Sequence, residues 1–560
     1  MPKNQRLVPF LAFTAVFAAL AGFVFWGTWS PDVAPVMPDC ATTHSAHWIA
    51  DWVRGFCENG KFVPDDLKVF LCSPYYLQEF QYAFAAYCAA LGLVYFLRGR
   101  GLSPLASYGA GLLLAFSGYW FSLFSAGHLG WFRWMTYGVF AFGLIDRAIA
   151  GGKLRHWLLL GACVAWASFY QSDLWLLFTV LTGAYFIFRS VSARSFDWKG
   201  MLAAAAVFFA IGGPSFKDAI GSGLKGRDEQ IAQGQTLGAA AQDKDADEKR
   251  WIFVTNWSLP PNESLEFFSP RLNGDTSCPF TLAIGARHRS GVKPYAGALG
   301  RPKDAPSGNY RQHSLYVGLI TCLLALVGGL SGLRNRTIEQ SNNLKSNNLK
   351  SNNLKSNNQT IILFFLIAAV VFWLFSMGRY CEPVYRLVYM LPFGDYLRAP
   401  VKWHHLTEFC LCVLAGFGLD LLGELLSRVS CLASWSGILV GIVAVIGATD
   451  LARVNRLYCA PVDYAEARRT NASAQLTFLP KQQFADPRVQ QMVRNRQIQS
   501  VAYYPGRDDV YLVEVLTPRE KQKDGDISPF SNLLGMLSVL TTLGVTIYCI
   551  SASMRSRNMV

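Results

Sequence analysis

The amino-acid sequence predicts an all-α polytopic membrane protein. Its 560 residues are 52% hydrophobic and only 16% charged, whereas soluble proteins are about a quarter charged. Long apolar segments recur along the chain, and each can cross a hydrocarbon core of about 30 Å as a helix. Lysine and arginine concentrate in the connections between these segments, so the net charge of +14 does not require a nucleic-acid partner.

About twelve membrane spans are expected from segment length and hydropathy. The first apolar run, LVPFLAFTAVFAALAGFVFW, is longer than the apolar part of a signal peptide and lacks a following A-x-A site, which indicates a retained helix. The expected spans are residues 8–28, 79–97, 104–123, 131–149, 156–170, 174–190, 200–214, 314–333, 360–377, 402–424, 432–450 and 530–552.

The distribution of basic residues predicts the orientation. With a cytoplasmic N-terminus, nearly all inward connections are rich in lysine and arginine, as the positive-inside rule requires. Both termini are then cytoplasmic, and the long connections face outward. The inward segments are 98–101, 146–156, 189–200, 334–359, 424–430 and 555–558. The outward segments are 29–78, 215–313, 378–401 and 451–529.

This orientation divides the chain into membrane modules and outer segments. The expected units are a membrane module over 1–214 with the first outer loop 29–78, an outer loop over 215–313, membrane helices over 314–450, an outer segment over 451–529, and a last helix with a basic tail over 530–560.

Three shorter segments carry their own predictions. The charged stretch 238–250 is predicted to be mobile, and the YLVEV run at 511–515 suits a short strand. The pentapeptide repeat SNNLKSNNLKSNNLKSNN lies within 335–359, and we interpret it as a flexible cytoplasmic linker because Asn and Ser disfavour helix.

Six of the thirteen cysteines face outward on this topology. Disulfides are permitted there if the outside is a periplasm, but their pairing cannot be read from the sequence. These outward cysteines contain no CxxC pair, which argues against a cysteine-based metal site. They are Cys40, Cys57, Cys72, Cys278, Cys381 and Cys459.

Polar residues from four outward segments are expected to gather at one membrane face. Carboxylates there can act as a general base on a hydroxyl or hold a divalent metal, and arginine or lysine can clamp a phosphate. The combination suits transfer from a lipid-linked phosphate donor, although each residue alone also suits a solvated helix end. The residues are Asp32, Asp39, His44, His47, His128, Arg133, Gln171, Asp173, Arg379, Glu382, Asp395, Arg398, Lys402, His404 and His405.

Several of these segments resemble a known family. The motifs are PDCATTHSAHWIADWVRGF (38–56), FSGYWFSLFSAGHLGWFRWMTYGVFAFGLIDRAI (116–149), TNWSLPPNESLEFFSPRLNGD (255–275), HSLYVGLITCLLALVGGL (313–330) and FSMGRYCEPVYRLVYMLPFGDYLRAPVKW (375–403). In order and spacing they resemble the YfhO-like bacterial membrane proteins, which are placed with the GT-C glycosyltransferase superfamily. The resemblance covers about residues 8–425.

The resemblance implies an outward-facing catalytic site that takes a sugar from a polyprenyl-phosphate donor and passes it to a cell-envelope glycan or lipid. It implies a bacterial inner-membrane location. Asp39 matches the family's first-loop acid, the general base or metal ligand, and His128 matches its Gly-His turn. Arg398 and Lys402 match the R-x-P-x-K motif and are assigned, with Arg379, to the donor phosphate.

The chain also departs from the family pattern. Many GT-C enzymes carry a close acidic pair, but Asp32 and Asp39 are separated by prolines, and the PPEE loop keeps only Glu263. Asp173 is therefore our substitute for a second catalytic acid, and Asp395 is a further outer-face candidate. These differences leave dependence on Mg or Mn open.

Two other function classes remain as alternatives. A transporter or flippase of lipid-linked precursors is expected to carry ionisable residues inside its spans, and the nearest candidates are Glu408 and Asp420. A non-catalytic envelope-assembly protein of the same fold is the third possibility.

Overall fold

The computed structural model of the protein covers its membrane helices and part of the connecting segments. Among the described residues the chain is predominantly helical, which confirms the helical membrane-protein class predicted from composition. The described residues are 3–26, 33–35, 77–126, 133–169, 173–218, 228–229, 245–273, 314–342, 349–391, 394–458, 461–463, 473–480, 486–494, 498–504, 507–517, 537–538, 540–548 and 551.

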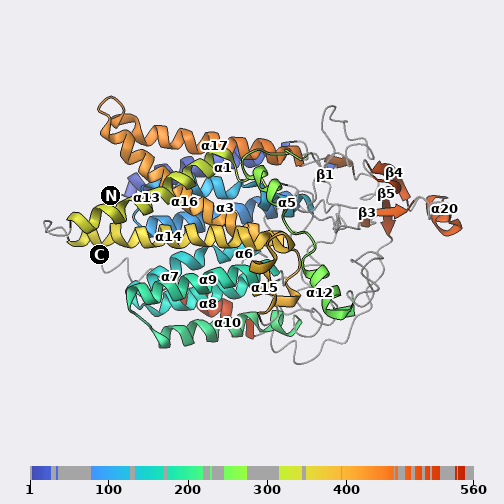
Figure 1. The fold of residues 1–560 in the computed structure, drawn as a ribbon, viewed down its shortest axis with the longest axis horizontal. Helices are drawn as coiled ribbons and strands as arrows, with labels where there is room; N and C mark the ends of the chain where they lie inside the picture. The colour runs from blue at the N-terminus through green and yellow to red at the C-terminus, as the bar shows by residue number, and fades with distance from the viewer. Residues whose placement is uncertain are drawn as a thin grey trace.

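The helices run back and forth along one long direction and form a bundle (Figure 1). A helix satisfies its own backbone hydrogen bonds, so it is the form that an apolar segment adopts in a bilayer. In the N-terminal half the helices are α1 (Lys3–Val24), α3 (Leu77–Gly99), α4 (Pro104–Ala115), α5 (Gly118–Ala126), α6 (Arg133–Gly138), α7 (Phe140–Gly151), α8 (Leu154–Ser168), α9 (Asp173–Ala193) and α10 (Trp198–Asp218).

The C-terminal half continues the bundle and adds short helical turns at one end of it. Its helices are α12 (Ala246–Val254), η7 (Pro261–Phe267), α13 (Leu319–Asn342), α14 (Leu349–Ser376), η10 (Gly378–Cys381), α15 (Glu382–Tyr389), η11 (Gly394–Tyr396), η12 (Pro400–Trp403), α16 (His404–Arg428), η13 (Ala433–Trp435), α17 (Ser436–Tyr458) and α20 (Pro487–Arg494).

Six described helices are long and apolar enough to cross a membrane. They contain Leu7–Val24, Phe80–Gly99, Leu174–Ala193, Asn358–Ser376, Pro400–Arg428 and Ala433–Leu457. Three shorter apolar helices cover Pro104–Ala115, Trp198–Gly213 and Leu319–Gly332. The chain is thus a multi-spanning membrane protein.

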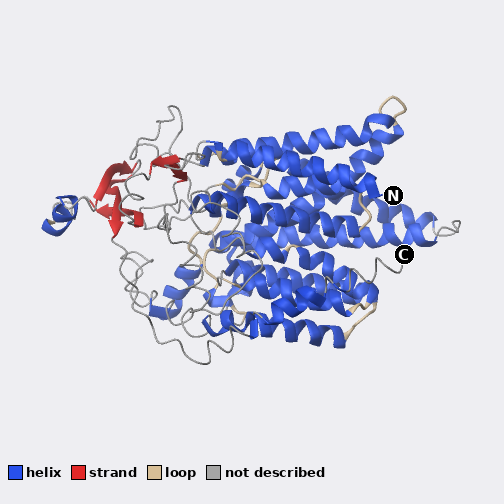
Figure 2. Cartoon of the chain, turned by 180° about the vertical axis from the view of Figure 1, so that it is seen from behind, coloured by secondary structure: helices blue, strands red, loops and turns tan. Residues whose placement is uncertain are grey.

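Two small sheets lie beyond one end of the bundle (Figure 2). Strand β1 (Val33–Pro35) pairs antiparallel with β2 (Pro461–Asp463), so the segments that follow α1 and α17 meet. The other sheet has the antiparallel order β3-β5-β4, and its strands are β3 (Ser473–Pro480), β4 (Ile498–Tyr504) and β5 (Arg507–Thr517). Strand β5 contains the predicted strand 511–515, and the all-α prediction left out the other strands.

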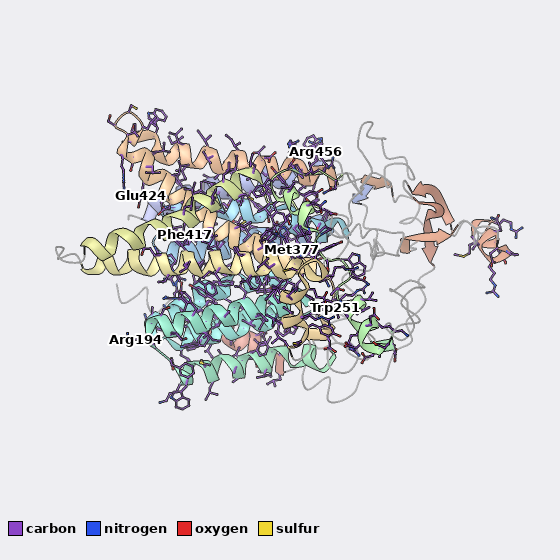
Figure 3. The ribbon with its side chains drawn as sticks, in the orientation of Figure 1. Arg194, Trp251, Met377, Phe417, Glu424 and Arg456 are labelled. Atoms are coloured by element: carbon purple, nitrogen blue, oxygen red, sulfur yellow. The ribbon has the colours of Figure 1, made fainter. Side chains whose placement is uncertain are left out.

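The two ends of the bundle differ in composition. Figure 3 shows Arg194 and Glu424 at one end, and Trp251 and Arg456 towards the other. We call the first the basic end and the second, from which the strands project, the sheet end. The connections at the basic end are 99–104, 151–154, 193–198 and 428–436. Each of them overlaps or adjoins a connection that the positive-inside rule assigned to the cytoplasm.

Two predicted spans are interrupted rather than continuous. The segment 104–123 is divided into α4 and α5, because backbone groups between the two helices form hydrogen bonds with distant parts of the chain. The Asn455 side chain donates to the Phe116 carbonyl at 2.8 Å, and the Gly118 amide donates to the Tyr316 carbonyl at 2.9 Å. The segment 131–149 has a much smaller break between α6 and α7: only Val139 separates them, and its φ of −62° and ψ of −31° remain helical.

Helices extend into both stretches for which flexibility is predicted, 335–359 and 238–250. Helix α13 runs on to Asn342 and α14 begins at Leu349, so both enter the predicted linker. Extending an existing helix adds a hydrogen bond per residue without a new nucleation step, which outweighs the modest penalty of Asn and Ser. Within 238–250, helix α12 begins directly after Asp245. The Asp245 side chain caps the helix by accepting a hydrogen bond from the Glu248 amide at 2.8 Å.

Close helix packing in the bundle depends on glycine. A Cβ at Gly328 of α13 would collide with the Leu414 carbonyl of α16, and a Cβ at Gly418 of α16 would collide with the Leu324 carbonyl of α13. The two helices therefore approach backbone to backbone, as small residues allow within membranes. This contact fixes α16, which begins at the sheet end with residues of the predicted site.

Candidate functional site

Segments distant in sequence are joined by backbone hydrogen bonds at the sheet end. The Ala399 amide donates to the Val254 carbonyl at 3.1 Å, and the Val401 amide donates to the Trp257 carbonyl at 3.1 Å. The Leu259 amide donates to the Ser376 carbonyl at 2.9 Å. The segment that follows α14 and the 255–275 loop are thereby held together.

The backbone at this junction adopts left-handed conformations that side chains disfavour. Trp257 has φ +58°, Ala399 has φ +64° and Gly378 has φ +49°. Strain of this kind persists only where surrounding structure fixes it, and it concentrates at binding and catalytic sites. Gly378 is needed for a second reason, since a Cβ there would collide with the Ser258 hydroxyl.

Arg398 lies at the centre of this strained junction. Its guanidinium carbon is 4.1 Å from the ring centroid of Trp257 and 4.7 Å from that of Phe253. Arginine stacks on aromatic faces in this way while its planar edge carries the hydrogen-bond donors. Lys402 follows in η12, the turn that leads into α16. The structure therefore places both motif residues at the entrance to one membrane helix.

Arg379 is held by the loop that it faces. Its guanidinium donates to the Thr255 carbonyl at 2.8 and 3.2 Å and to the Asn256 side chain at 3.3 Å, while its amide donates to Ser258 at 3.0 Å. Burial lowers the pKa of Arg379 below its ordinary value. These contacts make Arg379 the residue that positions the 255–258 turn beneath Arg398.

Glu263 and Arg379 belong to segments that are far apart in the sequence, but both lie close enough to Tyr380 for their charges to act on its phenol. Burial raises the pKa of the Tyr380 phenol, the Arg379 charge opposes this shift, and the Glu263 charge adds to it. Glu263 lies in the first turn of η7 and is 1% exposed.

Asp395 belongs to a more peripheral group of ion pairs. Its carboxylate lies 3.1 Å from a guanidinium nitrogen of Arg250, which also contacts Asp228 at 2.8 Å. Nearby, the Tyr389 hydroxyl donates to Asp247 at 3.0 Å. Burial and this hydrogen bond raise the pKa of Tyr389 to about 12. These contacts fasten α12 to the segment containing α15 and η11.

Several predicted residues lie outside the described part of the chain. They are Asp32, Asp39, His44, His47, His128, Cys40, Cys57, Cys72, Cys278 and Cys459. Asp173 is the first residue of α9, so its backbone stands at the start of a span. Cys381 is a free thiol as far as the described residues extend. In those same residues no group of three His, Cys, Asp or Glu side chains is arranged to hold a metal ion.

The sequence places His404 and His405 among the outward polar residues and Glu408 inside a span, but it does not predict that the three form one buried cluster at the start of α16. Glu408 and His404 of α16 are 0% exposed and His405 is 1% exposed. The signal for the cluster is the pattern HHxxE at the start of an otherwise apolar span. Asp420, the other ionisable candidate inside a span, accepts the Ser103 amide at 2.8 Å at the basic end.

The sheet end thus combines a stacked arginine, a lysine in a short turn, buried carboxylates and strained backbone. Of these features, the arginine and the lysine can bind an anion. The chain matches no protein-family model, and no curated protein matches it.

Proposed function

We propose that the protein is an integral-membrane glycosyltransferase that moves a sugar from a polyprenyl-phosphate donor to a cell-envelope acceptor. The observation that carries the proposal is the position of Arg398, stacked on Trp257 and Phe253 and followed by Lys402 at the mouth of α16. A planar guanidinium fixed on aromatic rings suits a phosphate, because its donors match two phosphate oxygens at once.

An exposed apolar surface beside this arginine supports a lipid-linked donor. Leu387 of α15 is 63% exposed, and Met390 and Leu391, which follow the helix, are 75% and 58% exposed. Their exposed side chains suit contact with lipid chains, whereas Arg386 on the same helix pairs with Glu382. A polyprenyl chain can lie along this surface while its phosphate reaches Arg398.

The remaining expectations form part of the same proposal. The chain has about twelve spans in a GT-C arrangement and belongs with the YfhO-like proteins. The sheet end faces outward from a bacterial inner membrane, and both termini are cytoplasmic. Asp39 acts as the general base, with Asp173 and His128 at the catalytic site, and a glycan or lipid serves as acceptor. Mg or Mn is an optional partner of these acids.

One observation favours a second function, a transporter of lipid-linked precursors. The division between α4 and α5 interrupts a membrane helix next to the buried Glu408, whose carboxylate accepts the Tyr119 amide at 3.1 Å. Interrupted helices and intramembrane carboxylates are typical of transporters.

The experiment that tests the proposal is label transfer from radiolabelled polyprenyl-phosphate sugars by the full chain in lipid nanodiscs, with and without EDTA. Asp39→Asn is expected to abolish transfer while donor binding persists. Arg398→Gln is expected to weaken donor binding about 10- to 100-fold, because charge-assisted hydrogen bonds contribute about 1.5–3 kcal/mol.

Arg386→Gln is the matched control. Arg386 also stacks on a tryptophan, with its guanidinium carbon 3.8 Å from the Trp251 ring centroid, and it also lies at the sheet end. Replacing Arg386 should leave the rate of sugar transfer unchanged. If folded wild type transfers no sugar from any donor but moves labelled lipid across the bilayer, the transporter function replaces the transferase.

A further inference from the structure

Three titratable side chains of α16 form a polar cluster in the apolar interior. His404 is packed against Phe267, with ring centroids 4.1 Å apart, and its Nε2 lies 3.3 Å from the Leu315 carbonyl oxygen. Glu408 Oε2 lies 3.9 Å from His405 Nδ1. Because α16 rises about 1.5 Å per residue, Glu408 lies about 6 Å inside the start of the helix.

The Tyr119 amide and the Ser117 hydroxyl both interact with the Glu408 carboxylate, which leaves one of its two oxygens without a hydrogen bond to the described residues. Oε1 accepts the Tyr119 amide at the N-terminus of α5, the half-helix that begins at the interrupted span. Oε2 has no hydrogen-bond partner among the described residues, and neither do the two ring nitrogens of His405. Buried polar atoms without partners are rare in proteins and usually have a functional reason.

The ring of His405 is enclosed by aromatic faces. Its centroid is 4.0 Å from that of Tyr119, in a stacked arrangement, and 4.3 Å from that of Trp120. Such faces stabilise a positively charged imidazolium. The surrounding low dielectric instead favours a pair without separated charge. Both effects are satisfied when the pair carries no net charge, which requires one proton in addition to the ring proton of a neutral imidazole.

The other titratable groups near the pair are few. Lys402 and His404 lie within electrostatic reach of His405 on the same segment. Tyr82 of α3, Cys322 of α13 and Cys412 of α16 lie within reach of Glu408. The described residues of α5 include no charged side chain. Among these groups Lys402 is the one with a permanent positive charge.

We infer that Glu408 and His405 form an intramembrane proton-binding site in which one proton is shared between Glu408 Oε2 and His405 Nδ1. Transfer breaks the O–H bond of the carboxylic acid and forms the N–H bond of an imidazolium, leaving a carboxylate. No other reactant is required. The two atoms need to approach by only about 1 Å to reach a normal hydrogen-bond distance.

The position of the proton changes the cap of α5. When it is on His405, the full negative charge of Glu408 faces the positive N-terminus of α5 and holds the half-helix firmly. When it is on Glu408, this attraction weakens. The site does not depend on the glycosyltransferase proposal.

The test is infrared spectroscopy of the carboxylic acid C=O stretch, combined with nitrogen NMR of ¹⁵N-histidine, on the full chain in nanodiscs without any donor. Wild type should show a Glu408 acid band that is lost in Glu408→Gln, and a partly protonated His405. In His405→Gln the acid band should grow, since only one position remains. Thr407→Val, which alters a neighbouring buried side chain, should leave both signals unchanged.

Two results would overturn the inference. One is a wild-type spectrum of ionised Glu408 beside a neutral His405, which means that the pair holds no proton. The other is an acid band that is identical in wild type and His405→Gln, which means that the proton is not shared. If Glu408→Gln does not fold, His405→Gln alone still separates these outcomes. Arg398→Gln should not change the spectra. A failure of the proposed donor site can therefore be told apart from a failure of the proton-binding site.

Discussion

Arginines gather at both ends of the bundle, but they have different surroundings. At the basic end, Arg100 and Arg189 converge on one carboxylate, Asp146, with Arg189 Nε at 2.8 Å. At the sheet end, Arg398 lies against aromatic rings on a strained backbone. At the basic end a carboxylate neutralises the charge of the arginines. At the sheet end aromatic rings pack against the flat face of the Arg398 guanidinium.

The cluster at the basic end joins helices α7, α9 and α14 to the connection between α3 and α4. Tyr185 also donates to Asp146 at 2.9 Å, and Asn358 of α14 donates to the Arg100 carbonyl at 3.0 Å. Burial acts to lower the pKa of Arg100, but the oxygens of Tyr185 and Asp146 outweigh it and raise that pKa above its ordinary value. The two ends therefore hold their arginines differently: by a buried carboxylate at the basic end and by aromatic rings at the sheet end.

The largest expected effect is on the stability of the basic end. Asp146→Ala leaves two arginines without their carboxylate, and breaking a buried ion pair in this way costs about 3–5 kcal/mol. Thermal unfolding in detergent should show a large fall in Tm. Glu382→Gln is the control: its pair with Arg386 is exposed, so the loss should be within about 1 kcal/mol. If both variants lose a similar amount of unfolding free energy, the ion pairs of the basic end are no more stabilising than the exposed pair at the sheet end.

An intermediate effect is expected from relieving strain at the sheet end. Ala399 has φ +64°, and a left-handed residue costs about 1–2 kcal/mol relative to glycine. Ala399→Gly should therefore raise the free energy of unfolding by up to about 1 kcal/mol while weakening donor binding at the less rigid junction. Ala448→Gly in the interior of α17 should do the opposite and destabilise. A drop in stability for both variants would argue that the left-handed backbone carries no strain.

The smallest effect concerns the contact between α12 and α15. The folded state raises the pKa of Tyr389 from its ordinary 10.0 to about 12, so it binds this proton more tightly than the unfolded chain does. The resulting stabilisation is complete below pH 10 and is lost as the pH rises through 12. Unfolding measured across this range should show a small decline that Tyr389→Phe removes. An unchanged decline in that variant would assign it to another group.

The sequence by itself determined that the protein is helical and that its long helices are apolar enough to cross a membrane. Apolar length and the positions of lysine and arginine depend on transfer between water and lipid, which acts on each segment independently of its partners. For the same reason the R-x-P-x-K residues Arg398 and Lys402 could be assigned to the mouth of a span. Local strand propensity was likewise enough to find 511–515.

Only the tertiary structure decided where helices are interrupted and which polar groups meet. Helix α4 ends because Asn455, more than three hundred residues further along the chain, captures the Phe116 carbonyl, and no local pattern encodes that contact. The contacts of Arg379 and Glu408 could not be predicted either. Arg379 donates to the Thr255 carbonyl. Glu408 lies beside His405 and accepts a hydrogen bond from the start of α5. Burial makes such contacts decisive, since a polar group without water must find its partner within the fold.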